Sequence, residues 1–304
     1  MRFINKKLKT ESNCLKTQTR NEVGMVWKQS FIETSRGRFE YFQKGNGEPL
    51  CVTHLYSEYN TNGNTFAQPF TDHYTVYLVN LKGCGNSVKA VHESEYRMSE
   101  TVKDLEAIRE ALNIAKWGFA GHSTGGMLAL MYGATAQESL TKIIGGGLCA
   151  SAAYMDHPGS IYCKENPNNA RIIEILRLLD SPTTPIEERR ALNKEWFLMS
   201  IFDYEQYEEI INRPNSGKVV SPRLNYFSYQ ELKTYDVRPL LPSIQIPASI
   251  YCGLYDAQCP HVFSKEAADL MPNASMTTFE RSNHNPFVEE EESFVQFVQS
   301  TVSN

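Results

Sequence analysis

A serine stands between glycines near the middle of the chain, in the stretch GHSTG at residues 121–125. Residues 117–122 have a strand-like pattern, and residues 124–135 have the pattern of a helix rich in small side chains. G-x-S-x-G between a strand and a helix is typical of a tight turn that lifts the serine Oγ above the sheet edge, because the glycines let the chain cross closely. The pattern predicts Ser123 as a nucleophile, with a packing turn as the alternative.

A serine hydroxyl needs a base to take its proton and an acid to orient that base. In folds with this turn, the acid and then the base follow the serine along the chain. Asp256 ends the strand-like stretch 247–256, and His284 follows the strand-like stretch 275–282. Because the ends of parallel strands meet at one edge of a sheet, we predict Asp256 as the acid and His284 as the base. A helix-capping aspartate and a surface-loop histidine are the alternatives.

An acyl-transfer site also needs two N–H donors for the oxyanion. One comes from the residue after the nucleophile, here Thr124, and the other comes from a loop after an early strand. The loop that follows the strand-like stretch 50–55 is in the right place. We predict Tyr56 as the second donor, with Leu55 as the alternative, and expect His54 to hold this loop rather than to react.

Strand and helix patterns alternate around these residues, which predicts an α/β fold with a mostly parallel sheet covered by helices on both faces. The alternation stops at residues 150–236, where three helical patterns indicate an inserted helical cap over the strand ends. Strands are expected at 30–34, 38–45, 50–55, 74–81, 117–122, 141–148, 247–256 and 275–282, and helices at 99–113, 124–135, 169–180, 185–202, 203–212, 262–270 and 289–302.

The division of the chain follows from these patterns. Residues 25–149 and 237–304 are expected to form the core domain, and residues 150–236 the cap. Residues 1–24 are basic and polar and lack the apolar core of a secretory signal. We expect a disordered extension or a start placed upstream of Met25, with a targeting peptide as the alternative.

Charge and composition exclude several function classes. The 304 residues carry a net charge of −5 and show no basic stripe, so a nucleic-acid partner is not expected. No window approaches the about 20 apolar residues of a membrane span. The seven cysteines form no C-x-x-C pair, and no ligands stand at metal spacing, so we expect reduced thiols, no metal and no cofactor. We expect a cytoplasmic protein, and the sequence leaves its oligomeric state undetermined.

Four stretches carry a resemblance to a known family. They are GHSTGG at 121–126, VNLKGCGNS at 79–87, YCGLYDAQCP at 251–260 and SNHNPF at 282–287. The chain resembles the α/β-hydrolase superfamily from about residue 30 onward, and within it the proline iminopeptidase-like, cap-bearing branch. The resemblance implies an eight-stranded-type sheet, with Ser123 as nucleophile, Asp256 as acid, His284 as base, and Tyr56 and Thr124 as oxyanion donors.

Two stretches depart from the family pattern. Asn80 and Lys82 stand where the D-x-R-G-x-G-x-S stretch has Asp and Arg, and HLYSE at 54–58 stands where these enzymes usually have His-Gly. We therefore expect a serine hydrolase that cleaves a small carboxyl ester, lactone or amide. An iminopeptidase-like aminopeptidase and a non-catalytic ligand receptor are the alternatives. In iminopeptidases, acidic cap residues bind the free amine of the substrate, and this cap offers Glu187, Glu188, Glu195, Glu205, Glu208 and Glu209.

Overall fold

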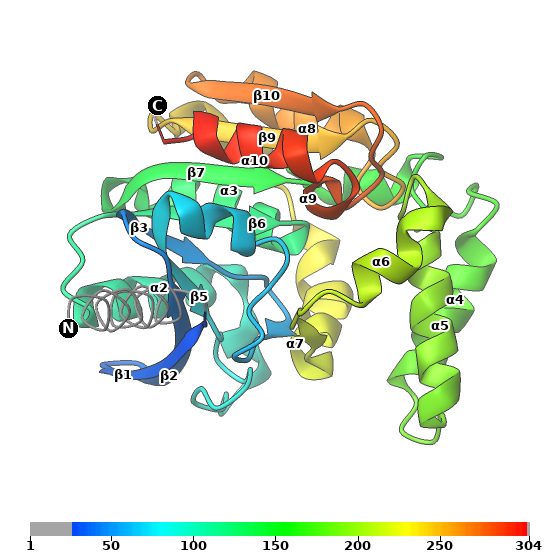
Figure 1. Ribbon diagram of the computed structural model, residues 1–304, viewed down its shortest axis with the longest axis horizontal. Helices are drawn as coiled ribbons and strands as arrows, with labels where there is room; N and C mark the ends of the chain where they lie inside the picture. The colour runs from blue at the N-terminus through cyan, green and yellow to red at the C-terminus, as the bar shows by residue number, and fades with distance from the viewer. Residues whose placement is uncertain (1–25, 303–304) are drawn as a thin grey trace, which may run out of the picture.

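An eight-stranded sheet forms the centre of the computed structural model, which describes residues 26–302 (Figure 1). The strand order is β1-β2-β5-β3-β6-β7-β9-β10. The pairs β1–β2 and β2–β5 are antiparallel, and the other pairs are parallel, as the α/β prediction requires. The strands are β1 Lys28–Thr34, β2 Gly37–Lys44, β3 Glu48–Val52, β5 Tyr74–Val79, β6 Trp117–His122, β7 Leu140–Gly146, β9 Ala248–Gly253 and β10 Ala274–Phe279.

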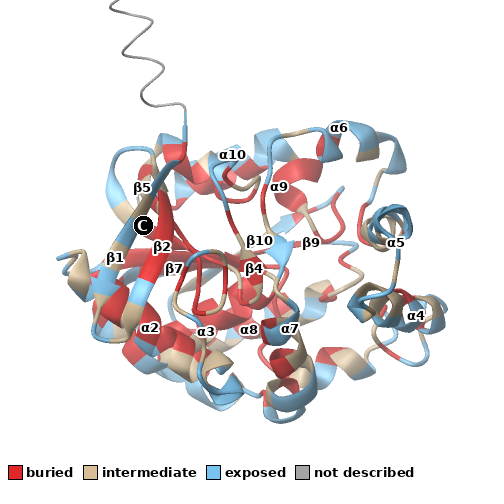
Figure 2. Cartoon of the chain, turned by 90° about the horizontal axis from the view of Figure 1, so that it is seen from below, coloured by how far each residue is buried: buried red, intermediate tan, exposed pale blue. Residues whose placement is uncertain are grey.

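Helices cover both faces of this sheet, and alternate strand residues supply the apolar contacts to each. Cys51 and Phe119 belong to one core cluster, together with side chains of α2 Met98–Ala111, α3 Thr124–Ala136 and α8 His261–Leu270. Leu50 and Ala120 belong to a second cluster, with side chains of η1 Gln68–Asp72, α9 Pro286–Glu289 and α10 Glu291–Ser300. Figure 2 shows the inner strands as a buried layer between these helices, whereas β1 at the sheet edge is mostly exposed. The period-2 alternation of strand side chains explains the two clusters.

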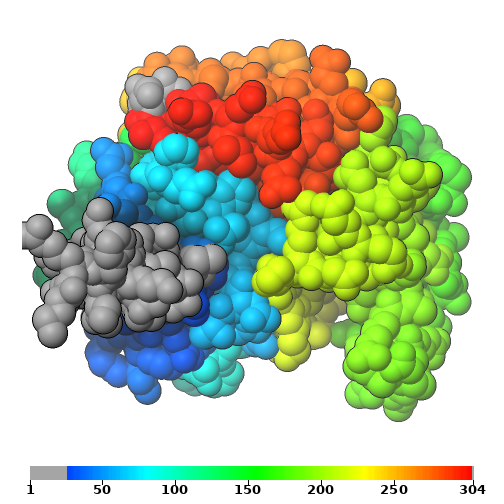
Figure 3. Space-filling view, in the orientation of Figure 1, coloured from blue at the N-terminus to red at the C-terminus, as the bar shows by residue number. Residues whose placement is uncertain are grey.

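Between β7 and β9 the chain leaves the sheet and is mainly helical. Helices α4 and α5 lie side by side at one side of the molecule (Figure 1), where the segment forms a yellow-green block against the C-terminal surface (Figure 3). Their outward faces are exposed (Figure 2). The helices are α4 Asn169–Asp180, α5 Ile186–Leu198, α6 Tyr207–Ile211 and α7 Ser221–Tyr226.

The two ends of this helical segment meet where it leaves the sheet. Ser151 and Asp236 form an antiparallel bridge. Beside it, the Val237 N–H donates to the Ala150 carbonyl over 2.8 Å. Inside the segment, β8 Lys218–Val219 pairs with β4 Ser57–Glu58, which directly follows the predicted oxyanion loop.

The sequence prediction was wrong by three residues at the ends of three strands. The strands predicted at 247–256 and 275–282 end at Gly253 and Phe279. The predicted strand 50–55 ends at Val52, because the Thr53 hydroxyl donates to the Val79 carbonyl over 2.8 Å and the next residues turn away. The predicted extension of residues 1–24 lies outside the described residues. Within residues 26–302, no helix combines the length and the apolar character that crossing a bilayer requires.

Candidate active site

Ser123 lies at the sharp turn between β6 and α3, at the carboxyl end of a central parallel strand. Its backbone has φ 56° and ψ −123°, a left-handed conformation that is strained for a residue with a side chain. A Cβ on Gly121 would collide with the Gly125 carbonyl, and a Cβ on Gly125 would lie 2.5 Å from the Thr53 carbonyl oxygen. The two glycines are therefore required for the crossing, as the G-x-S-x-G pattern predicts.

Asp256 and His284 face each other at the neighbouring strand ends. Nδ1 of His284 lies 2.8 Å from Oδ2 and 3.0 Å from Oδ1 of Asp256, and both residues are buried. An ionised carboxylate only accepts hydrogen bonds, so the Nδ1 atom carries the proton. With Nδ1 bonded to the carboxylate, Nε2 is the ring atom of His284 left to act as a base.

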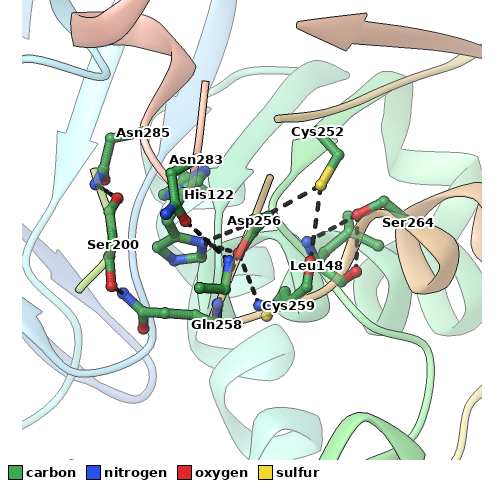
Figure 4. A network of polar contacts seen from close by, with 12 residues as sticks. His122, Leu148, Ser200, Cys252, Asp256, Gln258, Cys259, Ser264, Asn283 and Asn285 are labelled. Atoms are coloured by element: carbon green, nitrogen blue, oxygen red, sulfur yellow. Dashed lines mark hydrogen bonds and ion pairs between the residues drawn. The ribbon is translucent and has the colours of Figure 1, made fainter. Parts of the chain in front are cut away.

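The Asp256 carboxylate is fixed by its own loop as well. Oδ1 accepts backbone N–H bonds from Gln258 at 2.9 Å and from Cys259 at 2.8 Å (Figure 4). The Gln258 side chain in turn donates to Ser200 Oγ over 2.9 Å, which connects the acid loop to the helical segment. The helix-capping alternative for Asp256 is wrong, because the next helix, α8, begins after Pro260 and the Asp256 carboxylate instead binds the loop before it.

Glu289 holds the loop that carries His284. Its carboxylate accepts backbone N–H bonds from Asn283 at 3.0 Å, Asn285 at 2.9 Å and Phe202 at 2.6 Å. Burial raises the pKa of this carboxyl, and the three N–H bonds oppose that shift. Sequence reasoning missed Glu289, because it lies in the run EEEE, which has the pattern of an exposed helix start.

The His122 ring, next to Ser123 in the chain, packs against the His284 ring. The ring centroids of His122 and His284 are 4.6 Å apart, and His122 Nδ1 lies 3.0 Å from the Tyr251 hydroxyl. Burial lowers the pKa of His122 well below its ordinary value, so this imidazole is neutral. The Ser123 hydroxyl makes no hydrogen bond to another described residue, and such contacts often close only when substrate binds.

His54 connects the loop after β3 to the start of α3. Its Nδ1 accepts from the Tyr56 N–H over a long 3.5 Å and lies 3.0 Å from Ser57 Oγ. Because a backbone N–H only donates, Nε2 carries the ring proton and donates to Thr124 Oγ1 over 3.0 Å. Burial, with His284 and Arg223 nearby, lowers the pKa of His54 to about 3. His54 is therefore neutral and engaged at both nitrogens.

The two predicted oxyanion donors thus lie on either side of one imidazole. Thr124 is the first residue of α3, where a helix leaves its backbone N–H without an intrahelical acceptor. Tyr56 lies in the loop that His54 ties to Thr124. Burial raises the pKa of the Tyr56 hydroxyl to about 12, so this ring stays uncharged.

A cavity of about 190 Å³ opens beside this group. None of the five predicted site residues lines it, but their chain neighbours His122 and Asn285 do, as does His54. The inserted segment contributes Phe197 and Ile210. None of the described residues that line it is Asp, Glu, Lys or Arg. Within residues 26–302 there is no group of three or more His, Cys, Asp or Glu side chains that could hold a metal ion.

Comparison with known proteins supports this architecture. A family model described as the alpha/beta hydrolase fold matches residues 45–161. An alpha/beta fold family hydrolase from Bacillus anthracis str. Sterne is 62% identical, with a TM-score of 0.90 over 91% of this chain and 99% of that chain. A proline iminopeptidase of Heyndrickxia coagulans is 25% identical over 90% of this chain and 98% of its own length.

A more distant structure agrees in fold alone. The esterase from Exiguobacterium antarcticum is 20% identical, with a TM-score of 0.68 over 91% of this chain and all of the other. The 62% identity and the relatives named as hydrolases support an enzyme rather than the receptor that the sequence left open. The chain belongs to the α/β-hydrolase superfamily, and it is a hydrolase.

Proposed function

We propose that this protein is a serine hydrolase that cleaves a small carboxyl ester or lactone through an acyl-enzyme intermediate. The observation that carries the proposal is the Asp256–His284 pair at the same sheet edge as the strained Ser123 turn. A strained serine, an imidazole held through Nδ1 and a buried carboxylate are the parts that acyl transfer needs.

The reaction follows from these roles. His284 Nε2 takes the Ser123 proton, and the serine oxygen attacks the substrate carbonyl. The N–H groups of Thr124 and Tyr56 stabilise the oxyanion, and the His284 proton passes to the leaving group as its bond to carbon breaks. Water then attacks the acyl group with the same base and releases the acid and Ser123.

The size and the lining of the cavity suit a small, uncharged acyl group of the substrate. Its volume of about 190 Å³ lies below the about 300–1,000 Å³ of a pocket for a drug-sized ligand. Phe66 and Phe287 give it apolar walls, while Asn64 and Asn215 supply uncharged polar groups. We propose residues 150–236 as the cap that closes over this cavity, because Phe197 and Ile210 come from that segment.

An iminopeptidase-like aminopeptidase is the second candidate, favoured by the relative from Heyndrickxia coagulans. Such an enzyme needs acidic groups near the substrate amine. None of the six cap glutamates lines the cavity. Four of them pair with basic neighbours: Glu187 with Arg190, Glu195 with Arg171, Glu208 with Lys194 and Glu209 with Arg213. This arrangement favours the ester or lactone.

The test is a panel of acyl esters, lactones and N-terminal-proline amides, with Ser123→Ala as the control. We expect turnover of short esters or lactones, and a loss of up to about 10⁶-fold in the control. Turnover of proline amides alone would favour the second candidate. Full activity in Ser123→Ala would overturn the serine mechanism.

A further inference from the structure

Arg223 is a buried arginine of α7 that reaches the loop after β3. Its side chain is 1% exposed, and its three hydrogen bonds go to uncharged acceptors. Nε donates to the Leu55 carbonyl, Nη1 to the Lys82 carbonyl over 2.9 Å, and Nη2 to Thr101 Oγ1 over 2.9 Å. Among the described residues no carboxylate forms an ion pair with it. Removing a guanidinium from water without a carboxylate partner costs free energy of folding. A role in the loop that it contacts would account for this cost.

The contact fixes one peptide plane of the predicted oxyanion loop. In a trans peptide the carbonyl of Leu55 and the N–H of Tyr56 point in opposite directions. Because Arg223 holds that carbonyl on its own side, the Tyr56 N–H turns the other way. On that side its contact with His54 Nδ1 is long, at 3.5 Å, so the N–H is only weakly engaged and can donate to an oxyanion instead. The same imidazole contacts Thr124 Oγ1 at the start of α3.

The inserted segment holds the next peptide as well. The Val220 N–H donates to the Tyr56 carbonyl over 2.8 Å, and Val219 pairs with Ser57. Two consecutive carbonyls of the loop are therefore held by residues 219–223. The family pattern has His-Gly in this loop, whereas the chain has His54-Leu55. A flipped Leu55–Tyr56 peptide would replace an N–H donor with a carbonyl oxygen.

We propose that Arg223 is a positioning residue that orients the Tyr56 N–H for the oxyanion. This inference rests on the proposed serine-hydrolase function. It makes the inserted segment a structural part of the oxyanion site in addition to its role as a cap. Both acylation and deacylation pass through an oxyanion, so both steps depend on the contact.

The first experiment compares Arg223→Lys with the wild type on a short-chain ester. A lysine keeps the charge but cannot reach the three separate acceptors. We expect kcat to fall between about tenfold and a thousandfold, up to the loss of one oxyanion donor, with KM nearly unchanged. Arg109→Lys is the matched control, because Arg109 is buried and bonds the Ile114 and Ala115 carbonyls. Equal kcat values in both variants would overturn the proposal.

A double-mutant cycle tests whether Arg223 affects kcat through the Tyr56 N–H. Tyr56→Pro removes the N–H, and Tyr56→Ala removes the ring but keeps the N–H. Arg223→Lys should lower kcat in the Tyr56→Ala background and change it less than about twofold in the Tyr56→Pro background, since the two changes remove one interaction. Losses that multiply in both backgrounds would contradict the positioning role.

Two further measurements cover a variant that does not fold and test the proposed function separately. If Arg223→Lys does not fold, Thr101→Val takes its place, since it removes one anchor of the guanidinium. A fall in kcat then supports the proposal, and an unchanged kcat overturns it. Labelling of wild-type Ser123 by a fluorophosphonate tests the proposed function separately. Absence of that label rejects the serine mechanism, whereas a labelled enzyme with unaffected Arg223 variants rejects only this inference.

Discussion

At the scale of single residues, the Asp256 carboxylate sets the state of His284. The carboxylate only accepts, so it keeps a proton on Nδ1 and leaves Nε2 as the ring atom that can act as the base in our proposal. The backbone N–H groups of Gln258 and Cys259 hold the carboxylate in place. An asparagine at position 256 would favour the opposite His284 tautomer, because its NH₂ group can donate to Nδ1 and the proton would then lie on Nε2.

We therefore expect Asp256→Asn to lower kcat by about 10⁴-fold, as in other triads whose histidine tautomer is reversed. Asp236→Asn is the matched control. Asp236 is exposed and pairs with Arg238 at the base of the inserted segment. Steady-state kinetics on a short ester, with a thermal melt of both variants, provides the comparison. Similar losses in the two variants would contradict the assignment of Asp256.

At the scale of elements, α5 contributes one wall of the cavity. Phe197 is half-buried and lines the space beside Asn285. Phe202 lies further along the same segment, 39% exposed, and packs on Tyr255 with ring centroids 4.9 Å apart. Comparing substitutions of the two phenylalanines therefore distinguishes an effect on the cavity from a general effect on the inserted segment.

Phe197→Ala should enlarge the cavity and shift the preference toward longer acyl chains. We expect the ratio of kcat/KM for an octanoyl ester to that for an acetyl ester to rise about tenfold, given the free energy of burying methylenes in a pocket. Phe202→Ala should leave that ratio unchanged. A series of p-nitrophenyl esters measures it, and an unaltered ratio in Phe197→Ala would contradict the assignment of this cavity.

At the scale of the whole molecule, the buried Glu40 of β2 ties the N-terminal hairpin to the loop after β5. Its carboxylate accepts from the side chains of Gln29 at 2.6 Å and Asn80 at 2.7 Å, and from both N–H groups of Asn86. Asn80 also accepts from the Tyr59 N–H over 2.7 Å. An aspartate at position 80, as the family pattern has, would place a second negative charge beside Glu40. Asn80 avoids that repulsion and donates instead.

Glu40→Gln should lower the free energy of unfolding at pH 7 by about 2 kcal/mol, because a charge-assisted network is broken. Burial opposes the charge of Glu40, but the bonds from Asn86, Gln29 and Asn80 outweigh it and lower its pKa below the ordinary 4.5. This stabilisation is present above pH 4.5 and is lost as the pH falls through the native pKa.

Urea unfolding at several pH values measures both effects. The variant should lose less stability than the wild type on acidification. Glu33→Gln, whose side chain is 79% exposed, should match the wild type at each pH. A Glu40→Gln variant with wild-type stability at pH 7, or with the same acid dependence, would contradict the role of this network.

The limits of sequence prediction follow from which contacts are local. The G-x-S-x-G turn and the alternating strands are local patterns, and they predicted the sheet and most of its helices, whereas the roles of the site residues stay a prediction. The strand 50–55 was predicted too long, because a side-chain bond from Thr53 to Val79 ends it. Arg223 and Glu289 act on residues far away in sequence, Leu55 and Phe202. No local pattern in the chain reveals such contacts.

The central claim is that Ser123 carries the acyl group during turnover. Mass spectrometry of enzyme quenched in acid during hydrolysis of p-nitrophenyl butyrate tests it most directly. We predict a butyryl adduct on the peptide that contains Ser123, and no adduct in Ser123→Ala. An adduct on another residue, or turnover by Ser123→Ala at the wild-type rate, would contradict the account.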